Sequence, residues 1–217
     1  MTRARLISRV VKPTLYLAAL GPAVYAGLAL GLGWVDGDEV KFLQHVTGTT
    51  VLVALFVTLS ITPLRRLTGW NDLIRVRRLI GLTAFWYALL HFLSYLVFDQ
   101  LLSLPDIAKD VAKHPWVLVG FTSFLMLVPL AITSTKGWVR RLGGRRWQRL
   151  HRLIYPAAIG GVLHYLWLVK RDVTDPVYFG AALGVILVAR VWVGRAAERR
   201  QGRRTENTED IPSAAVP

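Results

Sequence analysis

Two histidines, His91 and His164, lie inside long apolar stretches of the chain. An imidazole inside a lipid bilayer costs free energy, so an intramembrane histidine is first of all a candidate for function. His91 lies twelve residues beyond Leu79, and His164 lies twelve residues beyond Arg152, about 18 Å up each helix at 1.5 Å per residue. Two imidazoles at one depth on different helices suit the two axial positions of a haem iron. We therefore predict a haem b axial pair, with two separately hydrogen-bonded histidines as the alternative.

The other three histidines differ in their position along the chain. His151 lies 13 residues before His164, about 19 to 20 Å along a helix, a separation that suits a second, stacked haem. Thirteen residues turn an ideal helix by about 220°, so the two share a face only if the helix is distorted. We predict His151 as a second haem ligand, with a structural interfacial residue as the alternative. We expect His45 at the outer rim, shallower than His91, in a structural, quinone-site or partner-contact role, and His114 as a solvated loop residue.

The absence of cysteine and of carboxylates within the apolar stretches argues against several kinds of metal site. The chain has no Cys, which excludes thiolate ligands, iron–sulfur clusters and covalently attached c-type haem. No carboxylate lies within the apolar stretches, which argues against non-haem iron, a di-metal site and a proton-coupled pump. Four residues flank the histidine pair and would either line a haem slot or belong to the aromatic belt at the membrane interface: Ser94, Tyr95, Tyr165 and Trp167.

Six apolar stretches must position these residues. They cover residues 14–34, 43–62, 79–98, 116–135, 153–169 and 177–194. Crossing about 30 Å of hydrocarbon takes roughly 20 residues of helix, and inside lipid every backbone polar group must be satisfied within its own element. The chain is 53% hydrophobic with a mean hydropathy of +0.42. We predict an all-α integral membrane protein with six transmembrane helices, in which Arg190 reaches back to the headgroups.

The net charge of the chain is +14, and the positions of its basic residues indicate how the chain is oriented in the membrane. Most of the 27 Lys and Arg lie at the N-terminus, in the loops after the second and fourth stretches and in the tail, which predicts that both termini face the cytoplasm. We expect no nucleic-acid partner, a cytoplasmic N-terminus at 1–12, one membrane domain at 13–195 and a disordered cytoplasmic tail at 196–217. No Walker or dinucleotide-binding motif is present.

The basic segment 133–152, TSTKGWVRRLGGRRWQRLHR, has a second interpretation besides topology. Arginine side chains bind carboxylates and phosphates well. The segment would then form an electropositive inner surface that holds haem propionates, a flavin phosphate or an acidic partner protein. Both interpretations can hold together.

Several motifs in order resemble one family: LQHVTG (43–48), ITPLRR (61–66), RRLIGL (77–82), HFLSY (91–95), TSTKGWVRRLGG (133–144), RWQRLHRLIY (146–155) and HYLWLVK (164–170). Together they resemble the MsrQ (YedZ) family, haem-binding membrane subunits of the bacterial periplasmic methionine sulfoxide reductase system. The wider resemblance is to the ferric reductase-like transmembrane domain, which places two histidines on each of two helices. Here the third apolar stretch keeps only His91, and Arg77 stands fourteen residues before it.

The resemblance implies a function in electron transfer at the bacterial inner membrane. It implies that electrons come from the quinone pool or a cytosolic flavin reductase, that FMN is a further cofactor, and that the acceptor is a periplasmic molybdopterin-containing MsrP-type catalytic subunit. The chain would then have no complete substrate site of its own. Two alternatives remain open: a stand-alone ferric or quinone reductase, and a membrane transporter or scaffold with packed histidines.

Overall fold

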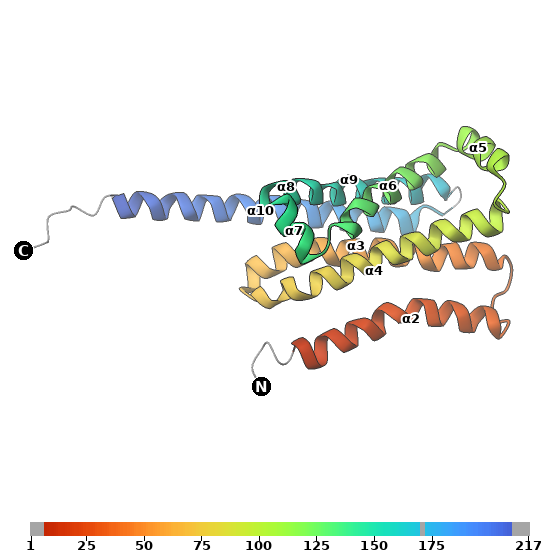
Figure 1. Cartoon of the computed structure of the whole chain (residues 1–217), viewed down its shortest axis with the longest axis horizontal. Coiled ribbons are helices and arrows are strands. Elements are labelled where there is room, and N and C mark those ends of the chain that lie inside the picture. Colours follow the sequence, from red (N-terminus) through yellow and green to blue (C-terminus); the bar gives the residue numbers. More distant parts are fainter. Residues whose placement is uncertain (1–6, 170–171, 210–217) are drawn as a thin grey trace, which may run out of the picture.

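A computed structural model describes residues 7–169 and 172–209 of the chain. These residues are nearly all helical. The elements, in order, are η1 (Ile7–Val11), α2 (Lys12–Gly31), α3 (Glu39–Thr68), η2 (Asn71–Leu73), α4 (Ile74–Ser94), η3 (Tyr95–Asp99), α5 (Leu104–Lys113), α6 (Pro115–Ile132), α7 (Lys136–Leu142), α8 (Gly144–Leu150), η4 (His151–Leu153), α9 (Ile154–Leu168) and α10 (Thr174–Glu209). The helices α3, α4, α6, α9 and α10 run side by side, and α2 lies along the edge of this bundle (Figure 1).

Five described helices are long and apolar enough to cross a membrane: Arg9–Gly31, Glu39–Thr68, Asn71–Asp99, Pro115–Ile132 and Thr174–Ala196. The fifth stretch predicted from the sequence forms α9, which has only 15 residues. At 1.5 Å per residue α9 is about 22 Å long. The short 3-10 segment η4 precedes it and adds about 6 Å. The bundle is thus a helical membrane domain, in which α9 is shorter than the span that the sequence predicted.

Local signals set where the long helices begin and end. The Asp38 side chain caps α3 by accepting hydrogen bonds from the backbone N–H groups of Val40 and Lys41. Gly69, with φ of 69°, ends the same helix in the left-handed conformation. The cap at Asp38 makes α3 begin several residues before the apolar stretch that the sequence predicted.

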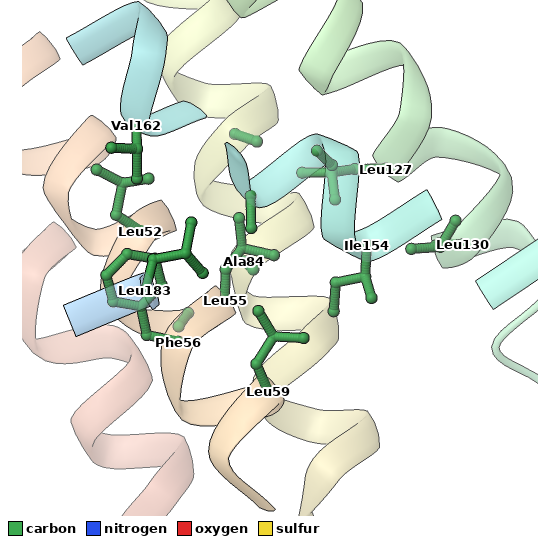
Figure 2. Packing of buried hydrophobic residues seen from close by; sticks show 14 residues of the cluster. Leu52, Leu55, Phe56, Leu59, Ala84, Leu127, Leu130, Ile154, Val162 and Leu183 are labelled. Carbon is green, nitrogen blue, oxygen red and sulfur yellow. The ribbon is translucent and has the colours of Figure 1, made fainter. Parts of the chain in front are cut away.

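The core lies where α3, α4, α6, α9 and α10 meet (Figure 2). Leu59 of α3 is fully buried there, and Ala84 of α4 and Ala158 of α9 are fully buried beside the larger side chains. Small residues let membrane helices approach closely, and they stabilise the bundle by van der Waals packing. Large apolar side chains on the outer surface, such as Val185 at 70% exposure, face the direction in which lipid would lie.

The last helix is longer than the sequence predicted. α10 continues to Glu209 and projects beyond the bundle (Figure 1), into the segment for which a disordered tail was expected from residue 196. Arg, Gln, Glu and Ala favour helix, and a helix that is already nucleated extends at low cost. The end of the expected tail, 210–217, lies outside the described residues, as does the start of the N-terminal segment 1–12.

Tyr87 of α4 joins α2 to the bundle. Its hydroxyl donates to the carbonyl of Ala19 at 2.6 Å and accepts the backbone N–H of Ala23 at 3.0 Å. Replacing Tyr87 by Phe removes both bonds, so we expect the unfolding free energy in detergent to fall by about 1 kcal/mol. Thermal unfolding measures the change, with Tyr178→Phe at an exposed position of α10 as control. Equal melting temperatures for both variants would contradict this role.

Candidate functional site

His91 of α4 packs against the outer part of α3. Its Nδ1 lies 3.0 Å from the carbonyl oxygen of Gln44 and 3.2 Å from Oγ1 of Thr47. The Thr47 hydroxyl gives its own proton to the carbonyl of Leu43, 2.7 Å away, so both neighbours of Nδ1 act as acceptors. Nδ1 therefore carries the hydrogen, and Nε2 holds the lone pair.

His164 of α9 is oriented in the same way against α6. Its Nδ1 lies 2.7 Å from the carbonyl oxygen of Trp116. A carbonyl only accepts, so Nδ1 is again the protonated nitrogen. A backbone carbonyl on Nδ1 fixes both the tautomer and the ring orientation of a histidine whose Nε2 binds a metal.

The two histidines face each other inside the bundle. Their ring centroids are 6.1 Å apart, and the ring planes are nearly perpendicular at 86°. The prediction that His91 and His164 lie at one depth is confirmed by this contact. If the two imidazoles bound one metal ion from opposite sides, with bonds of about 2 Å each, the two binding nitrogens would lie about 4 Å apart. The observed separation of the ring centroids is compatible with this arrangement.

Two glycines make room for these imidazoles. A Cβ on Gly48 of α3 would lie 3.2 Å from Cε1 of His91, and a Cβ on Gly120 of α6 would lie 2.7 Å from Nδ1 of His164. Gly160 brings α6 and α9 together, since a Cβ there would lie 2.2 Å from Oγ of Ser123. Sequence reasoning missed Gly48 and Gly120, although a glycine inside an apolar helical stretch often marks close packing.

The donor set fits a haem better than a bare metal ion. Among the described residues no group of three or more His, Cys, Asp or Glu side chains comes together, so any iron here needs its other ligands from elsewhere. A porphyrin supplies four nitrogens and leaves two axial positions for imidazoles. His91 and His164 would hold those positions through Nε2, and Gln44 and Trp116 would hold the two rings by their carbonyls.

His151 lies at the other end of the bundle, in η4, and is not brought near the pair. Its Nε2 lies 3.1 Å from Oγ1 of Thr133, and Trp147 stacks on its ring at 3.9 Å between centroids. The Thr133 hydroxyl donates to the carbonyl of Pro129, so the His151 Nε2 is the donor and its Nδ1 the free nitrogen.

His45 lies deeper than the sequence predicted. Its neighbours Gln44 and Thr47 are the residues that contact His91, so His45 stands at the depth of His91 and not above it. The expectation of a shallower position is wrong because α3 begins at Glu39, well before the apolar stretch. The His45 side chain is exposed, and its ring lies 6.2 Å from the ring of Tyr165.

His114 is tied into the outer end of the bundle and is not a free loop residue. Its Nδ1 lies 2.8 Å from Oδ1 of Asp110, and the other oxygen of Asp110 accepts a hydrogen bond from the Tyr95 hydroxyl at 2.8 Å. The His114 ring also lies 4.5 Å from the ring of Trp116. These contacts hold α5 over the start of α6, next to the carbonyl that binds His164.

Two of the residues that flank the histidine pair in sequence, Ser94 and Trp167, differ in their exposure. Ser94 is buried and donates to the carbonyl of His91 at 2.8 Å, while Trp167 is 50% exposed, as an interfacial aromatic would be.

Arg190 turns inward instead of reaching for headgroups: it donates to the carbonyl of Leu59 and to the hydroxyl of Tyr155, both at 2.7 Å. The basic segment forms the short helices α7 and α8, which pack against each other at the end of the bundle opposite α5 (Figure 1).

Comparison with known proteins agrees with this arrangement. The family model for the ferric reductase like transmembrane component matches residues 45–162, which include His91 and His151 and end two residues before His164. Three relatives carry the name protein-methionine-sulfoxide reductase heme-binding subunit MsrQ. The protein of Herminiimonas arsenicoxydans is 47% identical over 84% of both chains. That of Ralstonia nicotianae is 45% identical over 89% of this chain and 90% of its own, and that of Xanthomonas oryzae pv. oryzae strain MAFF 311018 is 42% identical over 94% and 95%.

These matches extend over most of the chain and over most of each relative. The family model covers α4 and α6 in full, together with parts of α3 and α9. The chain belongs to the MsrQ family of heme-binding subunits and carries a ferric reductase-like transmembrane domain.

Proposed function

We propose that the chain binds one haem b between His91 and His164. The observation that carries the proposal is the shared tautomer of the two rings, each with Nδ1 on a backbone carbonyl and Nε2 left for iron. A bound haem would supply one-electron oxidation and reduction. The names of the relatives, which describe heme-binding subunits, support the same assignment.

We propose further that the chain relays electrons to a separate catalytic subunit. The donor would be the respiratory quinone pool or a reduced flavin, and the acceptor a periplasmic molybdopterin-containing MsrP-type methionine sulfoxide reductase that forms a heterodimer with this chain. The relatives' names support a methionine sulfoxide reductase partner. The sequence has no nucleotide-binding motif, which supports an external donor. The relay would serve repair of oxidised periplasmic proteins.

The topology proposed for this relay has six spans in the bacterial inner membrane, with both termini in the cytoplasm. The alternation of basic and weakly charged loops supports this orientation. α9, extended by η4, is about 28 Å long and would complete the sixth span. His91 and His164 would then lie near the periplasmic face.

His151 and the inner basic surface are proposed sites for further cofactors. His151 would hold a second haem through Nδ1, because its Nε2 is engaged by Thr133. No second histidine among the described residues contacts it, so its partner ligand would be of another kind. The arginines of α7 and α8 would bind the phosphate of an FMN.

Reconstitution tests the relay. In vesicles that contain the chain and its periplasmic reductase, we expect quinol or reduced flavin to reduce the haem, and methionine sulfoxide to reoxidise it only when the reductase is present. The absorbance of the haem α band measures both steps. Fast reoxidation by soluble ferric chelates without the partner would instead identify a stand-alone ferric reductase, and protein without any Soret band would favour a transporter or scaffold.

A further inference from the structure

An open apolar groove lies between α2 and the helices α3, α4 and α10, at the end of the bundle where α2 begins (Figure 1). Its volume is about 500 Å³, which is in the range of small-ligand sites. Along α3 the lining runs from Leu64 to Phe56, eight residues or about 12 Å at 1.5 Å per residue. One leaflet contributes about half of the 30 Å hydrocarbon core. The groove therefore has nearly the length of one leaflet's acyl chain.

The lining of the groove is almost wholly hydrocarbon. Leu15 of α2, Ile80 of α4 and Ile186 of α10 are typical of it. Ser60 is the one polar side chain among the described lining residues, and its hydroxyl already donates to the carbonyl of Phe56 at 2.8 Å. A polar ring in the groove would leave its hydrogen-bonding groups unpaired, whereas an apolar chain would not.

Trp70, in the turn between α3 and η2, adds a polar group at the end of the groove. Its ring packs against Ile61 and Val76, which both line the groove. Its Nε1 is buried and has no hydrogen-bond partner among the described residues. A buried N–H without a partner costs free energy, and tryptophans near a membrane interface usually donate this hydrogen to a polar group. The donor lies at the end where the head of an amphiphile would lie if its chain filled the groove.

Basic residues gather at the same end of the groove. Lys12 and Arg65 each follow a lining residue directly in sequence, and both are half-buried. The segments 9–12 and 64–78 contain one acidic residue, Asp72, which pairs with Arg75. They contain seven basic residues: Arg9, Lys12, Arg65, Arg66, Arg75, Arg77 and Arg78. Basic pockets between membrane helices bind anionic lipid headgroups.

We infer that the groove binds an anionic phospholipid of the leaflet on the side where α2 begins. One acyl chain lies in the groove, the phosphate lies between Lys12 and Arg65, and Trp70 donates its indole hydrogen to a headgroup oxygen. Trp70 as a whole is half-buried, so a small rotation of its side chain brings the N–H to that oxygen. The proposed topology makes this the cytoplasmic leaflet. The lipid site does not depend on the haem proposed between His91 and His164.

Native mass spectrometry of the full-length protein tests the charge of the headgroup. The protein is equilibrated in detergent with equal amounts of dioleoylphosphatidylglycerol, which is anionic, and dioleoylphosphatidylcholine, which is zwitterionic. We expect wild type to retain one phosphatidylglycerol in preference. A basic residue at a lipid headgroup changes the affinity about fivefold, so Lys12→Gln with Arg65→Gln weakens phosphatidylglycerol binding about 25-fold. Lys109→Gln with Lys113→Gln, at the opposite end of the bundle, removes as many charges and keeps wild-type binding.

Two kinds of variant test the groove and the indole without a change of charge. Ala182→Phe adds a ring to the lining and should lose the bound lipid, whereas Ala181→Phe, at an exposed position outside the lining, should keep it. Trp70→Phe removes only the N–H donor to a charged headgroup, so we expect binding to weaken about tenfold or more. Trp192→Phe, an exposed tryptophan of α10, is its control.

Brominated lipid gives a second readout within the folded protein. Bromine on the acyl chain of phosphatidylglycerol quenches nearby tryptophans, so it should quench the part of the fluorescence that Trp70→Phe lacks, in wild type and not in Ala182→Phe. Equal affinity of wild type for the two lipids, or equal retention by Ala182→Phe and Ala181→Phe, overturns the inference. Displacement of the brominated lipid by decylubiquinone, without any preference for phosphatidylglycerol, identifies another occupant and also overturns it. Protein without haem that still selects phosphatidylglycerol overturns the haem proposal and leaves the lipid site standing.

Discussion

His164→Ala and His91→Ala are each expected to abolish binding of the haem proposed between α4 and α9. Each substitution removes one of the two nitrogens proposed to bind the iron, and the described residues bring no third His, Cys, Asp or Glu together with the pair to replace it. Loss of either ligand should therefore give the same result. Haem per chain, from a pyridine haemochrome assay on purified protein, measures the effect.

Two further histidines make this experiment specific. His114→Ala should keep the haem, because His114 contacts Asp110 and Trp116 and not the pair. His151→Ala should also keep the haem of the pair, and any component that it alone removes belongs to a second, inner haem. If either His91→Ala or His164→Ala keeps an unchanged low-spin spectrum, the assignment of the axial pair is wrong.

Gly120→Ala is expected to weaken haem binding although it touches no proposed haem atom. The added Cβ would lie 2.7 Å from Nδ1 of His164, closer than real Cβ contacts come. The ring must move, which breaks its 2.7 Å bond to the Trp116 carbonyl. Loss of such an outer partner lowers metal affinity about 10- to 100-fold. Haem titration of apoprotein, followed at the Soret band, measures the affinity.

Two other glycine substitutions serve as controls for Gly120→Ala. Gly48→Ala places a Cβ 3.2 Å from Cε1 of His91, so a small shift of the ring relieves it and the loss is smaller. Gly184→Ala on α10 meets nothing within 4 Å and should bind haem like wild type. Equal affinities for all three variants would show that the glycines do not shape the ligand positions.

The depth of the histidine pair was predictable from the sequence because helix rise is constant. Counting from the inner boundaries placed His91 and His164 at one level, and their 6.1 Å separation agrees. The same counting gave the wrong depth for His45, because the Asp38 cap makes α3 begin before the apolar stretch from which the residues were counted. The residue at which a helix begins can depend on a single capping side chain, whereas the rise per residue within the helix is constant.

Tertiary contacts account for the other gaps between sequence and structure. The inward turn of Arg190 depends on the Leu59 carbonyl and the Tyr155 hydroxyl on two other helices, which no periodicity reveals. The role of Gly120 appears only when α6 and α9 are packed together. The tail was expected to be disordered from its composition, yet its residues also favour helix and follow one directly.

Pulsed electron paramagnetic resonance of the oxidised, full-length protein is the most direct test of the haem site. The pair of imidazoles, both held by Nδ1 on backbone carbonyls, predicts one low-spin ferric haem in the outer half of the bundle with two axial histidine nitrogens. Labelling histidine with ¹⁵N should change both axial couplings. A high-spin signal, a single histidine coupling, or protein that binds no haem would contradict the assignment of His91 and His164 as the axial pair.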